Sequence, residues 1–341
     1  MPRVVGIDPG TVSIDLVGLE NGKLWLDRTF PTREALATPG ELVRFLEAQG
    51  PLDLIAGPSG YGLPLILAAD ALESDLRLAF LSREGDRGGI GGLGRLSRLL
   101  AEAGLPVIYT PGVIHLPTVP PHRKANRVDL GTADKVAVAA LGIWDQTRRS
   151  GHSSFILLEL GGAFTAAVAV VDGRIIDGIG GTAGPVGWRS AGGWDGEVAF
   201  LAGRVTKEML FRGGASEAAP EDLPGYIEGA QKAVLGLTAA LPEPDEILLS
   251  GRQAQRAAIR EDLKRRLEAL APVRRLTGFA TVAKEGAQGA AIIADGLAGG
   301  ANRGITDGLH LRKASGTALD YLRVITPDDA RHQLGLSAGS A

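Results

Sequence analysis

The chain has 341 residues, of which 45% are hydrophobic and 22% are charged, and this composition excludes a mostly disordered protein. Its 36 basic and 39 acidic residues leave a net charge of −3, so we expect no nucleic-acid partner and no anionic membrane surface. Cysteine is absent, which excludes disulfides, thiolate nucleophiles and cysteine-ligated metals.

Glycine is the unusual feature of the composition. The chain has 49 glycines, about 14% of its residues against a usual ~7%, and they do not follow the every-third period of collagen. We therefore expect the excess in turns, tight loops and close approaches of backbone.

The amino terminus runs directly into a strand-like segment, Val4 to Asp8, which is not the pattern of a signal peptide. The most apolar stretch, residues 155–171, contains Glu159 and paired glycines and is shorter than the ~20 residues of a membrane span. We expect a soluble, cytoplasmic protein.

Each half of the chain opens with the same pattern of three strands. In the first half the strands are predicted at residues 3–8, 13–20 and 23–30, with a hairpin turn at 21–22. In the second half they are predicted at residues 154–160, 164–171 and 174–179, with a hairpin turn at 172–173. The repeated unit predicts a topological duplication.

Helices and strands alternate after each unit, which predicts α/β layers. In the first half we predict helices at residues 39–48, 93–103 and 132–146, and strands at residues 52–56, 76–81 and 106–110. In the second half we predict helices at residues 195–211, 223–240, 253–271, 285–298 and 314–322, and a strand at residues 246–249.

The loop after the first strand combines residue types that bind phosphate. Asp8 ends the strand, and Gly10, Thr11 and Ser13 follow it. A phosphate needs close backbone N–H groups, which glycine allows, together with hydroxyl donors, while an adjacent carboxylate can hold Mg²⁺ directly or through water. A tight turn that Asp8 caps is the structural alternative.

Three later segments add to this pattern. Residues 159–165 repeat it with Gly161, Gly162 and Thr165, and two such loops on facing domains can hold one polyphosphate from both sides. In residues 246–252, Gly251 ends a strand and would let an adenine lie flat on the backbone. In residues 285–291, small side chains would let a helix pack closely at a domain interface.

The order of these elements resembles the acetate and sugar kinase, heat-shock chaperone and actin superfamily over nearly the whole chain. More narrowly, residues 58–62, 87–93 and 123–135 look like segments of a family described as predicted butyrate kinases. The resemblance implies an α/β, two-lobed actin-like ATPase fold, made of duplicated ribonuclease H-like domains with a nucleotide cleft between the lobes. It also implies ATP and Mg²⁺ as cofactors and a small-molecule acceptor as partner.

The resemblance predicts three regions. Residues 1–150 form the N-terminal lobe with the first phosphate loop and the acceptor segment. Residues 151–300 form the C-terminal lobe with the second phosphate loop and the adenosine motif, and residues 301–341 form a tail that packs back on the N-terminal lobe. A homodimer is kept as an alternative to a monomer.

The sequence departs from the superfamily in the second phosphate loop. The superfamily usually has aspartate there, and this chain has Glu159. A longer carboxylate shifts the geometry of any metal or water, so we keep the loop as a phosphate site and do not assign Glu159 as a ligand.

The turn at residues 131–135, Gly-Thr-Ala-Asp-Lys, resembles the Gly-Ala-Asp-Arg segment of type III pantothenate kinases, in which the aspartate is the base that activates the acceptor. The resemblance implies that Asp134 is a base or an orienting group, with Thr132 as the helix cap. The structural alternative is that Asp134 only complements the helix dipole, a contribution of ~0.3–1 kcal/mol.

Two acceptor classes make different demands on this segment. A hydroxyl must lose its proton, so a base such as Asp134 would contribute about 10²–10⁴-fold. A carboxylate is already ionised at pH 7 and needs cations against repulsion from the γ-phosphate. The cluster of Arg123, Lys124, Arg127 and Lys135 favours a carboxylate, and a solvated basic loop is the structural alternative.

We therefore predict an ATP-dependent carboxylate kinase that makes an acyl phosphate from a short-chain acid such as butyrate. A kinase of a hydroxyl-bearing metabolite is one alternative, and a nucleotide-binding relative without transfer activity, which Glu159 favours, is the other. The predicted catalytic residues are Asp134 and Asp8, which also anchors the metal. The predicted nucleotide contacts are Gly10, Thr11, Ser13, Gly161, Gly162, Thr165, Gly251 and Arg252, and the predicted acceptor contacts are Arg123, Asn126, Arg127 and Lys135.

Two glycine-rich segments lie outside these sites. Residues 89–94 match G-x-G-x-x-G, but no strand directly precedes them and no acid occurs from 103 to 128, so the dinucleotide interpretation is weak and we predict a flexible lid over the acceptor. The glycines of residues 180–196 are placed near the cleft without an assigned role.

Overall fold

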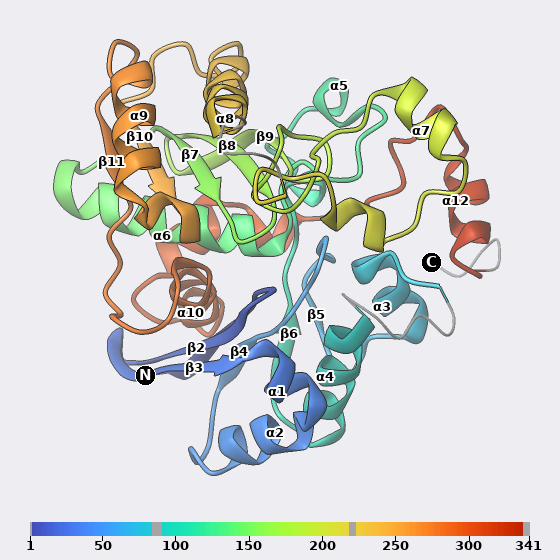
Figure 1. Ribbon diagram of the computed structural model, residues 1–341. Helices are drawn as coiled ribbons and strands as arrows, with labels where there is room; N and C mark the ends of the chain where they lie inside the picture. Colours follow the sequence, from blue (N-terminus) through green and yellow to red (C-terminus); the bar gives the residue numbers. More distant parts are fainter. Residues whose placement is uncertain (1, 84–90, 218–222, 337–341) are drawn as a thin grey trace.

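Two β-sheets form the centres of two lobes in the computed structural model, which describes residues 2–83, 91–217 and 223–336 (Figure 1). The first sheet has the order β3-β2-β1-β4-β6-β5 and the second has the order β11-β10-β7-β8-β9. The strands of the first sheet are β1 (Arg3–Pro9), β2 (Ser13–Glu20), β3 (Lys23–Pro31), β4 (Leu54–Ala56), β5 (Ile66–Leu67) and β6 (Val107–Tyr109). Those of the second are β7 (Phe155–Leu160), β8 (Thr165–Val171), β9 (Arg174–Ile179), β10 (Glu246–Ser250) and β11 (Val273–Arg275).

The two sheets share one topology. In the first, β1 pairs antiparallel with β2 and parallel with β4, and β4 continues parallel to β6. In the second, β7 pairs antiparallel with β8 and parallel with β10, and β10 continues parallel to β11. The order β3-β2-β1-β4-β6 therefore corresponds to β9-β8-β7-β10-β11, with β5 as an added edge strand. The duplication and the α/β fold class predicted from the sequence are confirmed.

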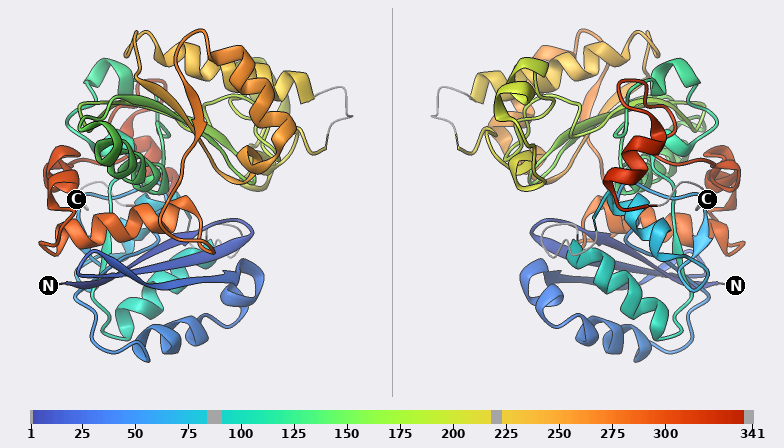
Figure 2. Two further views of the ribbon diagram at one scale, coloured as in Figure 1. Left: turned by 90° about the vertical axis from the view of Figure 1, so that its left-hand side faces the viewer. Right: turned by 90° about the vertical axis from the view of Figure 1, so that its right-hand side faces the viewer.

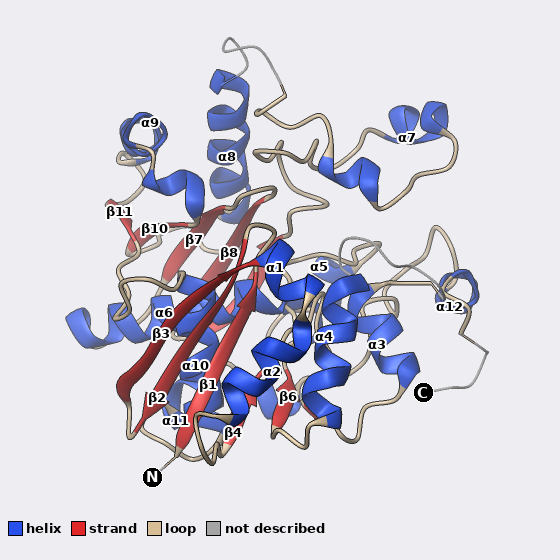
Figure 3. Ribbon diagram, turned by 60° about the horizontal axis from the view of Figure 1, so that its bottom comes forward, coloured by secondary structure: helices blue, strands red, loops and turns tan. Residues whose placement is uncertain are grey.

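Helices cover both faces of each sheet. The outer face of the first sheet packs against α1 (Thr32–Ala37), α2 (Pro39–Glu47), α3 (Glu73–Phe80) and α4 (Gly91–Glu102) (Figure 3). The outer face of the second packs against α8 (Leu223–Leu237) and α9 (Ala257–Leu267). Between the sheets lie α6 (Ala133–Ser150) and α10 (Glu285–Leu297) (Figure 2). The short elements are α5 (Pro121–Lys124), α7 (Gly196–Ala202), α11 (Arg303–Gly308), α12 (Pro327–Gln333), η1 (Val113–His115), η2 (Glu208–Phe211), η4 (Arg252–Gln255) and η5 (Leu311–Lys313).

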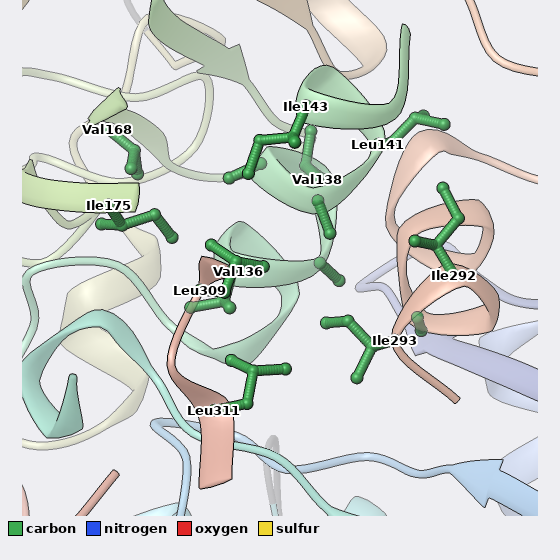
Figure 4. Packing of buried hydrophobic residues seen from close by; sticks show 14 of the residues in the cluster. Val136, Val138, Leu141, Ile143, Val168, Ile175, Ile292, Ile293, Leu309 and Leu311 are labelled. Carbon is green, nitrogen blue, oxygen red and sulfur yellow. The ribbon is translucent and has the colours of Figure 1, made fainter. Parts of the chain in front are cut away.

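The two central helices are exchanged between the halves of the chain. Helix α6 follows the first sheet in sequence but contacts β7 and β8, whereas α10 follows the second sheet and contacts β1 and β2. They also pack against each other, with Val136 and Leu141 of α6 and Ile292 and Ile293 of α10 in one buried cluster (Figure 4). One hydrophobic core therefore joins the lobes.

Missing side chains let α10 approach its neighbours closely. A Cβ on Gly6 of β1 would lie 2.1 Å from the backbone N of Ala291, and a Cβ on Gly289 would lie 1.7 Å from the carbonyl oxygen of Ala137. Neither contact leaves room for a methyl group, so glycine is required at residue 6 of β1 and at residue 289 of α10. The predicted close packing of the segment at residues 285–291 is confirmed.

The C-terminal tail returns to the first lobe, where Leu319, Ala330 and Leu336 join the buried cluster on the outer face of its sheet. The helix predicted around residues 314–322 is wrong, because those residues form turns and the helices of the described tail are α11 and, further along the chain, α12. There Thr326 and Asp329 form a capping box, with each side chain accepting from the other residue's backbone N–H.

Two further predicted elements are wrong. Residues 76–81 are not a strand, because residues 76–80 belong to α3 and Leu81 follows its end. In this helix Leu76, Ala79 and Phe80 are buried at helical spacing, and Asp75 accepts from the backbone N–H of Leu72. Residues 195–211 are not one helix: α7 ends at Ala202, because the next residue, Gly203, has a φ of +66° that stops the helix, and η2 follows. The helix predicted at residues 253–271 is shorter, since η4 precedes α9.

The Gly6 contact gives the first test. We expect Gly6→Ala to lower the free energy of unfolding by about 3 kcal/mol or more, because the added methyl group would overlap the α10 backbone. Gly40→Ala is the matched control, since a Cβ there meets only Arg44 at 3.7 Å and alanine is the better helix former. Urea unfolding measures both variants, and equal stabilities would contradict the proposed packing.

Candidate functional site

Three chain segments carry acidic side chains to one place between the lobes. Asp8 lies near the end of β1, Asp134 in the first turn of α6, and Glu159 near the end of β7. Electrostatic coupling links the carboxyl groups of Asp8, Asp134 and Glu159. The duplicated topology explains why these three side chains lie close together, because β1 and β7 are equivalent strands and α6 leads from one sheet to the other.

Lys135 is the centre of the first group of charges. Its Nζ atom lies 2.5 Å from Oδ2 of Asp134 and 3.0 Å from Oε2 of Glu159, and the Thr132 hydroxyl donates to Asp134. Burial disfavours the charged lysine, but the two carboxylates outweigh it and raise its pKa. Burial opposes ionisation of Asp134 as well, and Lys135 reverses that effect and lowers the pKa of Asp134. We therefore treat Asp134 and Lys135 as an ion pair.

Glu159 differs from Asp134 in its protonation. Burial raises its pKa from 4.5 to about 7, and the nearby Asp134 adds to the effect while Lys135 opposes it. Its carboxyl group is thus half protonated near neutral pH, although a lysine lies beside it. Glu159 was not predicted as a ligand from the sequence, and the structure places it inside the cluster.

Lys284 is the centre of a second group of charges. Its Nζ atom lies 2.8 Å from Oδ2 of Asp15 and 3.4 Å from Oδ2 of Asp8, and Oγ of Ser13 donates to Asp15 at 2.9 Å. Burial raises the pKa of Asp8, and the negative charges of Asp134 and Asp15 add to this while Lys284 opposes it. The four acids of the two groups outnumber the two lysines, so the site favours an added cation.

Asp27 of β3 positions Lys284 from outside the cluster. Its carboxylate accepts from the backbone N–H groups of Thr281 and Val282 at 2.8 and 3.0 Å, and from that of Ala283 at 2.7 Å. These bonds fix the segment that leads to Lys284. They also hold the pKa of Asp27 below its ordinary value, although burial acts in the opposite direction.

The two glycine loops face each other across this site. A Cβ on Gly162 would lie 3.4 Å from Oγ1 of Thr11. Tight turns shape both loops, since Gly10 donates to the Ser13 carbonyl and Gly161 to the Phe164 carbonyl. The backbone N–H groups of Thr11 and Gly162 donate to no residue in the described part of the chain. Both remain free to bind an anion.

The other predicted nucleotide contacts, Gly251, Arg252 and Thr165, differ in how accessible they are. Gly251 has a φ of +87°, and a Cβ there would lie 2.6 Å from the carbonyl oxygen of Leu160, so β10 and β7 end side by side. Arg252 is exposed at the start of η4. Thr165 is completely buried with its hydroxyl beside that of Tyr226, so its side chain does not reach the cleft.

Of the four predicted acceptor contacts, Lys135 lies in the charged cluster. The other three, Arg123, Asn126 and Arg127, have different surroundings. Arg123 donates to the carbonyl of Ile176 at 2.7 Å and pairs with Asp177. Oδ1 of Asn126 accepts from the backbone N–H groups of Arg323 and Val324, and Arg127 is exposed. These contacts join the segment at residues 123–127 to β9 and the tail, so a role for these three residues in acceptor binding has no support from the geometry and stays a prediction.

Arg189 is a functional candidate that the sequence analysis missed. Its backbone N–H donates to the carbonyl of Ala163 at 3.0 Å, and its Nε atom donates to the carbonyl of Gly162 at 3.2 Å. Its two terminal amino groups have no partner among the described residues. A half-buried guanidinium with a free planar fork suits a phosphate or a carboxylate. The sequence feature that could have indicated Arg189 is its position among the glycines of residues 180–196.

Asp129 explains part of that glycine cluster. Its Oδ1 atom accepts from the N–H of Gly131 at 3.0 Å, and its Oδ2 atom accepts from the N–H and hydroxyl of Thr182 at 3.0 and 2.9 Å. A Cβ on Gly180 would overlap this carboxylate at 1.9 Å. The loop after β9 thus wraps the turn that carries Thr132, Asp134 and Lys135. The Pro-Ser-Gly-Tyr-Gly loop at residues 58–62 supports the same turn, because the carbonyl of Gly60 accepts from Ala133.

The lid predicted at residues 89–94 falls partly on residues 84–90, which lie outside the described residues. The rest of that motif is the first turn of α4, which begins at Gly91.

A family profile described as "Protein of unknown function (DUF1464)" matches residues 6–324. The chain belongs to this family. No curated protein matches the sequence.

Solved kinase structures share the fold of this DUF1464 member. A propionate kinase from Francisella tularensis subsp. tularensis SCHU S4 is 12% identical, with a TM-score of 0.57 over 85% of this chain and 99% of that one. An acetate kinase from Entamoeba histolytica is 12% identical, with a TM-score of 0.55 over 79% of this chain and 87% of that one. The Porphyromonas gingivalis acetate kinase is 12% identical, with a TM-score of 0.54 over 79% and 88%. These likenesses show a two-lobed, acetate kinase-like α/β fold, the fold class that the sequence predicted.

Neither a preformed metal cage nor a membrane span occurs in the described ranges. No group of three or more His, Cys, Asp or Glu side chains there has a metal-binding arrangement. No described helix is both long and apolar enough to cross a bilayer.

The pKa of Glu159 gives a test by pH. Its folded value of about 7 lies above its ordinary value of 4.5, so the folded state binds the proton more tightly. The free energy of unfolding must fall as pH rises between these values, by at most about 1.4 kcal/mol per pH unit. Glu159→Gln removes this titration, so we expect its stability relative to the natural protein to rise from pH 5 to pH 8.

Chemical denaturation at several pH values measures this difference. Glu47→Gln, at an exposed position on α2, is the matched control and should follow the natural protein. A stability difference for Glu159→Gln that stays constant over this range would show that the carboxyl group does not titrate there.

Proposed function

We propose that the protein is an ATP-dependent phosphotransferase that converts a short-chain carboxylic acid into its acyl phosphate. The observation that carries this proposal is the partly buried cluster of Asp8, Asp134 and Glu159 with Lys135 and Lys284, at the point where the two glycine loops face each other. Phosphoryl transfer depends mainly on positioning and on neutralising charge. Solved acetate and propionate kinases with this fold support the choice of reaction class.

The nucleotide would lie between the two glycine loops. The unused N–H groups of Thr11 and Gly162 would bind phosphate oxygens from opposite lobes, and Gly251 would face the adenosine. Oxygen donors surround this place and acids exceed lysines there, which fits Mg²⁺, a hard cation held by one or two carboxylates together with phosphates. Asp8 and Asp15 are the residues that would hold it. When bound, Mg²⁺ neutralises phosphate charge.

The acceptor class follows from the charges on this chain. Asp134 is kept ionised by Lys135 and Thr132 with a lowered pKa, so it is a weak base. A hydroxyl acceptor needs a base, whereas a carboxylate has no proton to lose at pH 7. The free fork of Arg189 supplies the cation that brings an anionic acceptor and the γ-phosphate together. These two features favour a carboxylate, with Asp134 as an orienting group.

In the proposed reaction one carboxylate oxygen of the acid forms a bond to the γ-phosphorus. The bond between that phosphorus and the oxygen bridging to the β-phosphate breaks, and ADP leaves with the electron pair. No proton moves in the transfer itself. The remaining task of the protein is to hold the two anions in line, which Arg189 and Lys135 would do.

Hydroxylamine trapping tests the proposal. We expect ATP-dependent hydroxamate from acetate, propionate or butyrate, with ADP in equal amount. Arg189→Lys should reduce kcat/KM by about 100-fold, because a point charge replaces a bidentate donor. Arg265→Lys on the surface of α9 is the matched control and should retain full activity.

Two outcomes contradict the carboxylate assignment. ADP release with hydroxyl compounds and without hydroxamate would show a hydroxyl kinase. Binding of ATP without ADP release from any tested acid or alcohol would show a nucleotide-binding protein without transfer activity.

A further inference from the structure

Lys284 supplies a positive charge at the two carboxylates that we propose as metal ligands. Asp8 of β1 and Asp15 of β2 are directly opposite each other in the antiparallel pair, and like charges at such positions are destabilising. The Nζ atom of Lys284 lies 2.8 Å from Oδ2 of Asp15 and 3.4 Å from Oδ2 of Asp8. The carboxylates that would hold Mg²⁺ are therefore paired with an ammonium group of the chain itself.

Contacts on both sides fix these two carboxylates. Oγ of Ser13 donates to Oδ2 of Asp15 at 2.9 Å. A Cβ on Gly286 would lie 2.6 Å from the carboxylate carbon of Asp8, so the first turn of α10 packs directly against that side chain. Because β2 and α10 hold the acids, an exchange of cations at this place must move the lysine.

The side chain of Lys284 can move while its backbone stays in place. Asp27 fixes the segment before it, whereas the ammonium group sits on a flexible four-carbon stem. The side chain is 31% exposed, compared with 12% for Asp8 and 2% for Asp15, so it is the accessible member of this group. A Cβ on Gly10 would lie 2.4 Å from its Nζ atom, which places the ammonium group directly beside the first glycine loop.

An ammonium group and Mg²⁺ need more negative charge than these two acids provide. Asp8 and Asp15 carry at most two negative charges, whereas Lys284 and Mg²⁺ together carry three positive charges. Mg²⁺ holds its oxygen ligands at about 2.0–2.1 Å, and two cations at such short range repel each other. The phosphates of a nucleotide would supply the missing negative charge at Gly10, within reach of the lysine.

We propose that Lys284 closes the metal site to free Mg²⁺ and opens it when a nucleotide binds. In the nucleotide-free protein the ammonium group stays on Asp8 and Asp15. When phosphates enter the glycine loops, it moves to a phosphate oxygen, and the two carboxylates become available to the metal. This inference rests on the proposed function and adds an order of binding to it, in which the metal enters with the nucleotide.

Calorimetric titration of the full, nucleotide-free chain with Mg²⁺ alone tests the inference. We expect weak binding to the natural protein and at least about 10-fold tighter binding to Lys284→Met, because two acids lose their cation. The same variant should bind ATP in the presence of EDTA at least about 10-fold more weakly, since the phosphate loses a cationic contact. Removal of a side chain with a purely structural role would not shift the two affinities in opposite directions.

Two further variants separate charge from other effects. Lys284→Arg keeps the positive charge and should exclude free Mg²⁺ as the natural protein does. Lys232→Met on α8 is the matched control, because it also removes a lysine that is paired with a carboxylate, that of Glu228. It should match the natural protein in both titrations.

The expected instability of Lys284→Met is itself a readout. If the variant does not fold in metal-free buffer, Mg²⁺ should restore folding, because it replaces the missing positive charge, and a chelator should then unfold the protein. The inference is overturned if the folded variant binds Mg²⁺ with natural affinity, if the natural protein binds Mg²⁺ alone as tightly as the variant, or if Mg²⁺ does not restore an unfolded variant.

The two proposals fail separately in these experiments. Absence of hydroxamate from every tested acid would contradict the transfer reaction and would leave both titrations valid. Hydroxamate formation by the natural protein, together with natural Mg²⁺ affinity in Lys284→Met, would contradict only the role of Lys284.

Discussion

The pairing of two partly buried lysines with carboxylates from both halves of the chain is the constraint on which the site depends. Lys135 joins α6 to β7 through Asp134 and Glu159, and Lys284 joins the segment before α10 to β1 and β2. Removing one partner from a partly buried ion pair leaves the other charge without compensation, which destabilises the folded state more the less exposed that charge is. The arrangement therefore fixes where the strands end relative to the central helices, and it places charge where the glycine loops meet.

The exchanged helices give this arrangement its rigidity. Because α6 contacts the second sheet and α10 the first, each lobe contains an element from the other half of the sequence. The backbones of α10 and β1 touch at Gly6, and those of α10 and α6 touch at Gly289, so small shifts of one lobe act directly on the other. Interlocked elements of this kind hold charged groups at defined distances, which phosphoryl transfer requires.

Much of the fold could be predicted from the sequence, because local patterns determine it. The two three-strand units, their hairpin turns and the amphipathic helices follow from periodicity and turn residues, and Asp8, Asp134 and Lys135 were found from their place beside glycine turns. Arg189, Lys284 and Asp15 were missed. Lys284 pairs with Asp8 and Asp15, which lie at the other end of the chain, and Arg189 contacts Gly162 from 27 residues further along the chain, so no local pattern marks these roles. Nothing local distinguishes Lys284 from other lysines before Asp27 fixes its segment.

The wrong predictions also come from local patterns that contacts elsewhere in the chain override. Residues 76–81 are apolar enough for a buried strand, and the capping contact of Asp75 with Leu72 decides for a helix. The basic residues at 123–127 are close in sequence to the acceptor turn, but Arg123 and Asn126 bind backbone groups of β9 and the tail. The cluster of cations was predicted because these residues are close in sequence. In the folded chain Lys135 pairs with Asp134 and Glu159, whereas Arg123 contacts β9.

In the proposed function both glycine loops hold one nucleotide across the cluster. Hydrogen–deuterium exchange with and without ATP and Mg²⁺ tests it most directly, since the backbone N–H groups of Thr11 and Gly162 are unused in the structure. We predict slower exchange on nucleotide addition in peptides covering residues 8–13 and in peptides covering residues 159–165. Protection of one loop alone, or of neither, would contradict the account.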